Sequence, residues 1–434
     1  MGVPFHRVSI TEGVSFSWVQ DPKFKHNRLS INMLMPLEEG KVSERAIVPF
    51  ILRQGTAKYP DFTKLNEKLS DLYGASLEAS VDKYGSYQLL TLGMVGIDSR
   101  FAFDGEDMLR ELAELLADIL LEPALEDGVF NKNETALEKE YIKDTIEAEI
   151  NDKRTYALLR CKSIMSEGEK ISLRKFGTVE EVEQISPESA YKAYKEILDK
   201  SQIEIVMVGC GCPESACEQF KKRFAAMKRN PITVDIQNCR KLPVQKSKDF
   251  TEKIDVKQGK LVLGFRMDMD CSDEERNAAR LAIALLGNTP TCLLFKNVRE
   301  KLSLCYYCAA RLDTVTGIML VDSGVEAENC EKAKDEILKQ LEILKNGDFE
   351  ENELVETKLF MKTALRATGD SLGALENWYL SRVLSGNTKS PEETMDEILK
   401  VTKEQIVSAA KKLELDTIYR LLPKDEISDE KGVD

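Results

Sequence analysis

Residues 285–307 read LLGNTPTCLLFKNVREKLSLCYY, and this stretch decides the fold that we expect. An apolar helix ends here at a Gly287-Asn288 turn, and the next helix carries Glu300-Lys301-Leu302-Ser303 before an aromatic strand. The first half of the chain has the same order of features, with a Gly55-Thr56 turn and then a helix that carries Glu67-Lys68-Leu69-Ser70. Such self-similarity is typical of a duplicated structural unit. We therefore predict two homologous α+β domains of about 200 residues each.

Short strands and amphipathic helices are predicted around these stretches. Strand candidates are residues 30–36, 76–81, 87–95, 203–209, 260–267, 306–312 and 317–324. Helix candidates with apolar residues at helical spacing are residues 104–121, 131–153 and 329–345. We place an N-terminal domain at residues 1–225, a basic, proline-containing linker at 226–248, a C-terminal domain at 249–422 and a polar, disordered tail at 423–434.

The composition excludes several classes of protein. The chain has 434 residues with 61 Lys and Arg against 75 Asp and Glu, which gives a net charge of −14. Binding to nucleic acid through phosphate contacts needs a basic surface, so we expect no nucleic-acid partner. Only two histidines are present, His6 and His26. A metal site that needs two or three imidazoles is therefore almost excluded before any motif is considered.

The sequence also carries predictions about location. The first residues, MGVPFHRVSI, lack a basic segment followed by an apolar run, so we expect no signal peptide. No run approaches the 18–20 or so apolar residues that span a membrane. We therefore expect a cytoplasmic protein with no membrane association, whose ten cysteines are mostly small buried side chains.

Two groups of cysteines are candidate sites. Cys210, Cys212 and Cys217 surround a turn after a predicted strand, but no fourth ligand follows at the spacing of a zinc site. Cys305 and Cys308 form a C-x-x-C within a predicted strand, where residues three apart point to opposite faces. We expect neither group to bind a metal, and we expect no redox role for the second.

Four segments in the right order resemble the pitrilysin/insulinase metallopeptidase family, in its short form that is similar to mitochondrial processing peptidase. They are GTAKYPD (residues 55–61), FGTVEEVEQISPESAYKAYKEIL (176–198), LLGNTPTCLLFKNVREKLSLCYY (285–307) and VTKEQIVSAAKKL (401–413). The resemblance implies two homologous domains, each a mostly antiparallel sheet flanked by helices in the LuxS/metallohydrolase-like repeat. Together they would form half of a clam-like chamber.

Active members carry H-x-x-E-H on the first helix, where two histidines share a zinc ion and the glutamate takes a proton from its bound water. In the ungapped match before Gly55, the histidine positions hold Ala46 and Phe50, and the base position holds Pro49. None of these side chains can ligate a metal or accept a proton. Proline also lacks a backbone N–H, so we expect this helix to be kinked or to start late.

The later zinc ligand is also missing in this comparison. In LEKEYIKDTIEAEI, Glu138 matches the first glutamate of the family motif, and Thr145 falls at the metal-binding glutamate. The resemblance therefore implies an inactive homologue with no metal and no cofactor.

The second domain keeps its part of the motif. Active members use an arginine and a tyrosine in R-E-K-L-G-L-x-Y to hold the substrate, and Arg299 and Tyr306 match them, whereas Ser303 replaces the glycine. An arginine offers a planar fork of donors to a peptide carbonyl, and a tyrosine adds a hydroxyl donor. The resemblance thus assigns Arg299 and Tyr306 to substrate binding. The alternative is that Arg299 forms a surface ion pair and Tyr306 packs in the sheet.

These residues suggest a non-catalytic subunit of a heteromeric zinc-peptidase-like complex, whose partner is a paralogue with H-x-x-E-H. Such a chain would bind a peptide or an unfolded polypeptide, in part by strand addition at a sheet edge. Residues 55–77 and 401–423 further resemble a Firmicutes family of inactive homologues associated with 5-aminopentanol modification of elongation factor P.

Two other hypotheses remain open. A scaffolding protein with the same fold, similar to the core subunits of respiratory complexes, would assemble stably without contributing to peptidase turnover. An enzyme of another chemistry would need Cys210, Cys212 and nearby carboxylates, and no base is evident beside them. The sequence does not distinguish a monomer from a homodimer or a heterodimer.

Overall fold

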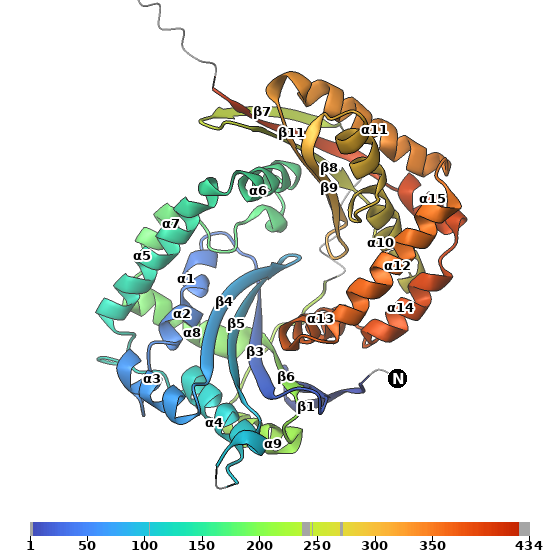
Figure 1. The fold of residues 1–434 in the computed structure, drawn as a ribbon. Coiled ribbons are helices and arrows are strands. Elements are labelled where there is room, and N and C mark those ends of the chain that lie inside the picture. The colour runs from blue at the N-terminus through green and yellow to red at the C-terminus, as the bar shows by residue number, and fades with distance from the viewer. Residues whose placement is uncertain (1–2, 104, 237–243, 245, 270–271, 425–434) are drawn as a thin grey trace, which may run out of the picture. The chain divides into compact units, whose positions relative to one another are not determined.

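The computed structural model describes residues 3–103, 105–236, 244, 246–269 and 272–424. The chain forms two compact units, each assembled from three segments (Figure 1). Unit 1 contains Met1–Glu147, Glu169–Cys239 and Ala364–Met395, and unit 2 contains Ala148–Gly168, Arg240–Thr363 and Asp396–Asp434. Residues 237–243 and 245 of the predicted linker and residues 425–434 of the predicted tail lie outside the described residues.

Unit 1 contains a six-stranded sheet with the order β1-β2-β6-β3-β5-β4. Its strands are β1 (Phe5–Thr11), β2 (Val14–Gln20), β3 (His26–Pro36), β4 (Ser76–Tyr84), β5 (Tyr87–Ile97) and β6 (Gln202–Gly209). Neighbouring strands are antiparallel except for β2 and β6, which are parallel. Strand β4 is an edge strand of this sheet, and an edge strand presents backbone groups to which another chain can pair.

Helices cover both faces of this sheet. They are α1 (Val42–Ala46), α2 (Val48–Leu52), α3 (Phe62–Asp71), α4 (Met108–Leu121), α5 (Lys132–Ala148), α7 (Val179–Glu183), α8 (Pro187–Lys200), α9 (Pro213–Phe224) and α13 (Leu372–Leu384). Because side chains alternate along a strand, β6 contributes to two separate cores. Ile203, Ile205 and Met207 join the main core, whereas Val206 and Val208 pack with Leu375, Tyr379 and Leu380 of α13.

Unit 2 contains a five-stranded sheet with the order β7-β11-β8-β10-β9. Its strands are β7 (Lys248–Ile254), β8 (Gly259–Arg266), β9 (Cys305–Asp313), β10 (Ile318–Val325) and β11 (Glu414–Pro423), and only β7 and β11 pair in parallel. Its helices are α6 (Lys153–Met165), α10 (Asp273–Gly287), α11 (Cys330–Asn346) and α15 (Lys403–Lys411). Helices α12 (Glu351–Thr368) and α14 (Pro391–Lys400) contain points where the chain passes between the units.

The C-terminal end of one predicted helix was wrong, because a second helix, α6, begins there. The sequence predicts one helix over residues 131–153, but α5 ends at Ala148 and α6 begins at Lys153. Asp152 caps the new helix, because its carboxylate accepts hydrogen bonds from the backbone N–H groups of Arg154 and Thr155 at 3.1 Å. Helix α6 then packs on the sheet of unit 2, where Arg154 Nη2 donates to the buried carboxylate of Asp322 at 3.2 Å.

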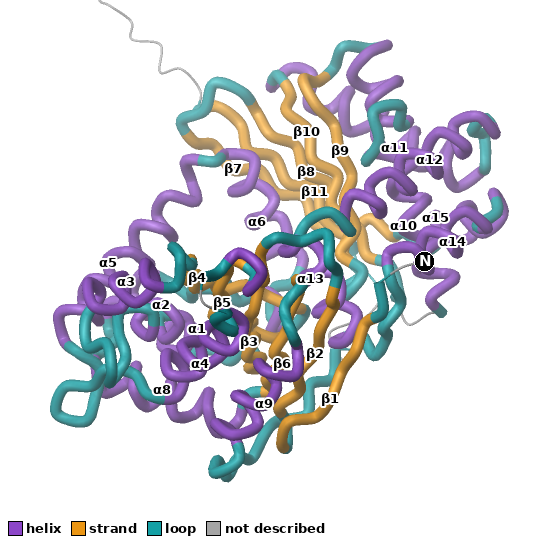
Figure 2. Tube along the Cα trace, turned by 60° about the horizontal axis from the view of Figure 1, so that its bottom comes forward, coloured by secondary structure: helices purple, strands orange, loops and turns teal. Residues whose placement is uncertain are grey.

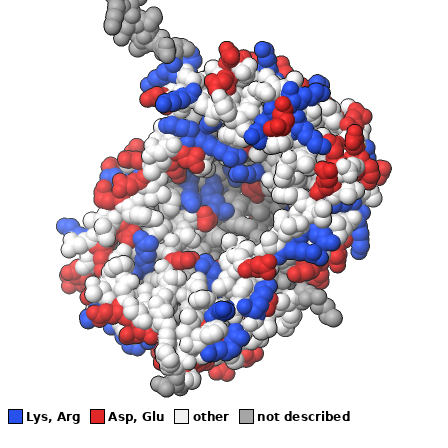
Figure 3. Space-filling model, in the orientation of Figure 1, with Lys and Arg blue, Asp and Glu red and all other residues white. Residues whose placement is uncertain are grey.

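The predicted fold class is confirmed: the chain is an α+β protein with two mostly antiparallel sheets flanked by helices. Figure 2 shows the two groups of strands, β1–β6 and β7–β11. Acidic and basic side chains are interspersed over the face drawn in Figure 3. Within the described part of the chain, no helix is both long enough and apolar enough to cross a membrane.

Candidate functional site

The helix that would carry the metal-binding histidines is interrupted in this chain. Helix α1 ends at Ala46 and α2 begins at Val48, with Ile47 between them. Pro49 lies in the first turn of α2, where its missing N–H breaks no helical hydrogen bond. The break at Ile47 agrees with the expectation that the helix around Pro49 is kinked or starts late. Ala46, at the position predicted for the first histidine, is completely buried in the core of unit 1.

Aromatic and cationic side chains surround the second histidine position. The ring of Phe50 is buried, and its centre lies 5.4 Å from that of Tyr141 and 6.2 Å from that of Phe176. The guanidinium of Arg53 lies over two of these rings, 5.2 Å from the centre of Phe50 and 5.5 Å from the centre of Tyr141. A protein cation therefore lies beside Phe50, the position predicted to correspond to the second histidine.

The carboxylate of Glu138 binds this cation. Glu138 is buried on α5, and both of its oxygens lie 3.4 Å from Arg53 Nη2. The amide of Gln54 donates a further hydrogen bond to the same carboxylate. A buried carboxylate is stable only with such partners. Sequence reasoning identified Glu138 through its motif but missed Arg53 and Gln54, which lie in the turn directly after α2.

Thr145, at the predicted position of the third zinc ligand, makes a local hydrogen bond. Its hydroxyl donates to the carbonyl of Tyr141, one turn earlier in α5, at 2.7 Å. Both histidines are exposed: His6 stacks on Trp18 at 5.0 Å between ring centres, and His26 opens β3. Within residues 3–424, apart from the gaps given above, no group of three or more His, Cys, Asp or Glu side chains could hold a metal ion.

Arg299 lies on a π-helical turn, η5 (Phe295–Lys301), that packs beside β9. Val298 is buried, whereas the side chain of Arg299 is 42% exposed. Its guanidinium lies 4.7 Å from the centre of the Phe295 ring, and Nε lies 3.6 Å from a carboxylate oxygen of Glu300. An exposed pair at this distance contributes little stability.

Ser303, which replaces the family's glycine, has a φ of 51°, in the left-handed region. An L-residue there costs about 1–2 kcal/mol, and a glycine recovers this at an entropic cost of about 0.5–1 kcal/mol. We expect Ser303→Gly to raise the free energy of unfolding by about 0.5 kcal/mol, measured by urea denaturation. Ser70→Gly, in the exposed face of α3, is the control and should lower it by a similar amount. A loss of stability in Ser303→Gly would show that the left-handed backbone conformation of Ser303 is not strained.

Tyr306 is the extra residue of a β-bulge at the start of β9. Cys305 pairs with Val325 and Tyr307 pairs with Gly324, so Tyr306 has no partner residue on β10. The side chain is 61% exposed, and its hydroxyl donates to a carboxylate oxygen of Glu326 at 2.8 Å. This hydrogen bond raises the pKa of Tyr306. Sequence reasoning missed Glu326, because its proximity to Tyr306 depends on the strand pairing.

The same bulge shows that the predicted geometry of the C-x-x-C was wrong. One inserted residue places Cys305 and Cys308 on the same face of β9, and they are only 9% and 7% exposed. The other cysteine group is more open, since Cys212 is exposed with its Sγ 3.2 Å from a carboxylate oxygen of Glu214, and Cys217 is buried.

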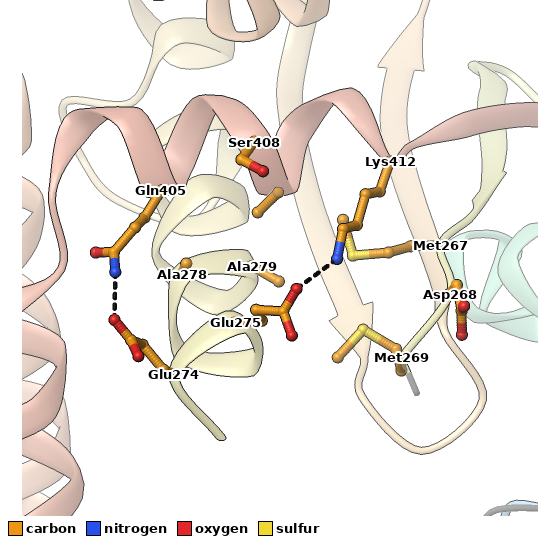
Figure 4. A pocket seen from close by; sticks show the side chains of 11 residues that line it. Met267, Asp268, Met269, Glu274, Glu275, Ala278, Ala279, Gln405, Ser408 and Lys412 are labelled. Atoms are coloured by element: carbon orange, nitrogen blue, oxygen red, sulfur yellow. Dashed lines mark hydrogen bonds and ion pairs between the residues drawn. The ribbon is translucent and has the colours of Figure 1, made fainter. Parts of the chain in front are cut away.

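A separate cavity of about 250 Å³ lies between α10 and α15 in unit 2 (Figure 4). Met267, Met269 and three alanines form its apolar part. Two polar pairs cross from α15 to α10: Gln405 with Glu274, and Lys412 with Glu275 at 2.8 Å between nitrogen and oxygen. Arg299 and Tyr306 do not line this cavity, so it is distinct from the predicted substrate-binding pair. Sequence reasoning missed it, because its lining combines residues about 130 positions apart.

Comparisons with known proteins agree with this geometry. Residues 184–360 match the family model of the peptidase M16 inactive domain. The chain is 32% identical to the probable inactive metalloprotease YmfF of Bacillus subtilis (strain 168) over 409 residues, which cover 94% of this chain and 96% of that protein. The crystal structure of a conserved protein from Enterococcus faecalis V583 covers 97% of this chain and 99% of its own, with 26% identity and a TM-score of 0.87. A protease from Helicobacter pylori has the same fold, with 14% identity, a TM-score of 0.77 and coverage of 97% and 100%.

Proposed function

Since this chain belongs to the M16 peptidase family and is one of its catalytically inactive members, we propose that it is the non-catalytic subunit of a heteromeric zinc-peptidase-like complex. In this proposal the partner is an active paralogue that carries H-x-x-E-H. This chain binds the substrate peptide and supplies Arg299 and Tyr306 to hold it. Its resemblance to the inactive homologues associated with elongation factor P extends the proposal to the modification of that factor.

The observation that carries the proposal is the exposure of the Arg299 and Tyr306 side chains. Residues at the two vacated histidine positions are buried, whereas these two polar side chains of unit 2 are 42% and 61% exposed. The β-bulge directs Tyr306 away from the sheet, and Glu326 orients its hydroxyl. A guanidinium fork offers donors to the carbonyl groups of a peptide backbone, and a phenol oxygen whose proton is donated to Glu326 can accept a hydrogen bond from a peptide N–H. Packing alone would not need either polar group.

The edge strands support peptide binding. β4 lies at an edge of the sheet of unit 1, and β9, which carries Tyr306, lies at an edge of the sheet of unit 2. An extended peptide can add to such an edge through backbone hydrogen bonds, which require no particular side chain on the strand. This form of recognition suits a substrate that is an unfolded polypeptide.

The experiment mixes the purified chain with its H-x-x-E-H paralogue and follows cleavage of a fluorogenic peptide. We expect activity that neither protein has alone, and about a tenfold loss of kcat/KM in Arg299→Ala and in Tyr306→Phe. A hydrogen bond from the charged guanidinium contributes about 1.5–3 kcal/mol, one between the neutral phenol and a peptide group about 0.5–1.5 kcal/mol, and 1.4 kcal/mol corresponds to a factor of ten. Arg311→Ala, an exposed arginine on β9, is the matched control and should leave the activity unchanged.

Three results separate this proposal from its alternative. If the complex forms but both variants keep full activity, the substrate-holding role of the pair is wrong. If the complex forms and adds no activity, the chain is a scaffolding homologue of the fold. Metal analysis of the isolated chain should find no stoichiometric zinc, and one zinc per chain would contradict both readings.

A further inference from the structure

Helix α12 carries a group of exposed apolar side chains in the part that belongs to unit 2. Val355 and Leu359 lie one turn apart on one face of the helix, and they are 54% and 62% exposed. Phe360 follows Leu359 and is 38% exposed. Leu399 of α14 is 37% exposed and lies close to the same part of the helix, because Lys358 Nζ donates to its carbonyl at 3.1 Å. A single exposed leucine is ordinary, but a group of this kind is typical of a surface that binds a partner.

Two charged residues beside this group, Glu356 and Lys362, have no partner of opposite charge within the helix. Ion pairs along a helix join residues three or four positions apart. At these distances the sequence offers no basic residue to Glu356 and no acidic residue to Lys362. Glu356 accepts a hydrogen bond from Asn352 Nδ2 at 2.9 Å, and Lys296 pairs with Glu353 at 2.9 Å and not with Glu356. In the described part of the chain, neither Glu356 nor Lys362 therefore forms an ion pair.

A second, antiparallel copy of α12 would provide both missing partners. The helix runs from Glu351 to Thr368, so Leu359 lies at its middle. If a two-fold axis passes beside Leu359, each residue faces the one that lies equally far on the other side of Leu359 in the second copy. Glu356 and Lys362 are each three positions from Leu359, so each carboxylate faces an ammonium group. The helix dipole favours acidic and basic residues only in the first and last turns, and neither residue lies there.

We propose that this face of α12 is the contact between two copies of this chain, in a two-fold dimer with antiparallel α12 helices. The two Leu359 side chains meet at the axis, Val355 packs on either side of them, and two pairs of Glu356 with Lys362 border the apolar strip. An 18-residue helix is about 27 Å long, so the contact is small. Interfaces that bury less than about 1,200 Å² are typical of weak complexes, and we therefore expect a dissociation constant on the order of 10 μM.

The test measures the mass of the full-length chain by sedimentation velocity between about 1 and 100 μM, with no other protein present. We expect a monomer at the lowest concentration and a dimer at the highest. Leu359→Glu places two carboxylates at the axis and should remain a monomer throughout. Leu137→Glu, which changes a leucine of α5 that is 61% exposed, is the matched control and should dimerise as the wild type does. Circular dichroism checks that both variants are folded.

Exchange of the two charges tests the antiparallel register. Glu356→Lys and Lys362→Glu each place like charges opposite one another, so each variant alone should be a monomer where the wild type is a dimer. A mixture of the two variants should form a heterodimer, because every lysine then faces a glutamate. The double variant should dimerise by itself for the same reason. Parallel helices would place each charge opposite its own copy, and the exchange would then restore nothing.

Three outcomes would overturn the proposal. A wild-type chain that stays monomeric at about 100 μM would mean that the α12 face binds a different partner. A dimer that persists in Leu359→Glu would place the contact elsewhere on the surface. A mixture of the two charge variants that stays monomeric would exclude the antiparallel register. Neither a paralogue nor a peptide is present in these measurements, so they are independent of the proposed function.

Discussion

Glu138→Ala is expected to lower the free energy of unfolding by about 3–4 kcal/mol, although the motif that Glu138 matches is predicted to bind no metal. The carboxylate is buried and accepts hydrogen bonds from Arg53 and Gln54. Removal of one partner from a buried pair leaves the other charge uncompensated, which typically costs about 3–5 kcal/mol. Arg53 is 29% exposed and regains some contact with water, which places our value at the lower end. Urea denaturation followed by circular dichroism measures the change.

Glu140→Ala provides a matched control on the same helix. Glu140 is exposed and pairs with Lys143 at 3.3 Å, three residues further along α5. An exposed pair of this kind contributes about 0–1 kcal/mol, so this variant should unfold close to the wild type. Equal losses in the two variants would mean that Glu138 acts through helix propensity and not through Arg53. The interpretation of the vacated site as a stabilising ion pair would then be wrong.

Gly287→Ala is expected to lower the free energy of unfolding by about 3 kcal/mol. Gly287 is the last residue of α10, and a Cβ there would lie 2.6 Å from the backbone nitrogen of Ala310 and 2.7 Å from its Cβ. A backbone atom of β9 cannot move aside as the end of a flexible side chain can. Overpacking in a core usually costs about 1–3 kcal/mol, and a backbone clash belongs at the upper end. Thermal and urea denaturation should both show the loss.

Gly373→Ala is the control for this effect. Gly373 lies in the first turn of α13, where a Cβ would meet nothing within 4 Å. Alanine is favoured over glycine inside a helix by about 1 kcal/mol, so this variant should be slightly more stable than the wild type. A neutral Gly287→Ala variant would show that β9 can move away from α10. The close contact between these two elements would then not be a requirement of the fold.

Sequence patterns predicted where most helices and strands lie, but not why particular residues occur in them. Gly287-Asn288 correctly marks the end of α10, but Gly287 has an ordinary φ and is required by its contact with β9. Apolar runs predicted seven strands and missed β1, β2, β7 and β11. β7 was missed because it is largely exposed and its pattern, KDFTEKI, is mostly polar. Whether such a segment forms a strand depends on its burial against another element, and the local sequence pattern does not show that burial.

In the candidate site, too, some features could be predicted from the sequence and others could not. The replacement of the two histidines by Ala46 and Phe50 and of the base by Pro49 could be predicted from the resemblance, because it depends on residue types at fixed spacing. The partners of Glu138 and the neighbours of Cys305 could not, because they depend on strand register and on side chains from other elements. A single inserted residue in β9 reversed the predicted orientation of one thiol. Arg299 and Tyr306 remain predicted substrate-binding residues.

The order in which the chain is synthesised gives α13 a further significance. Val206 and Val208 of β6 are covered by this helix, which begins about 160 residues after the strand ends. A ribosome that adds about 5–20 residues per second needs on the order of 10–30 s for this interval. During that time the nascent first half holds an apolar sheet face without its covering helix. A ribosome-associated chaperone would have its main opportunity to bind this protein in that interval.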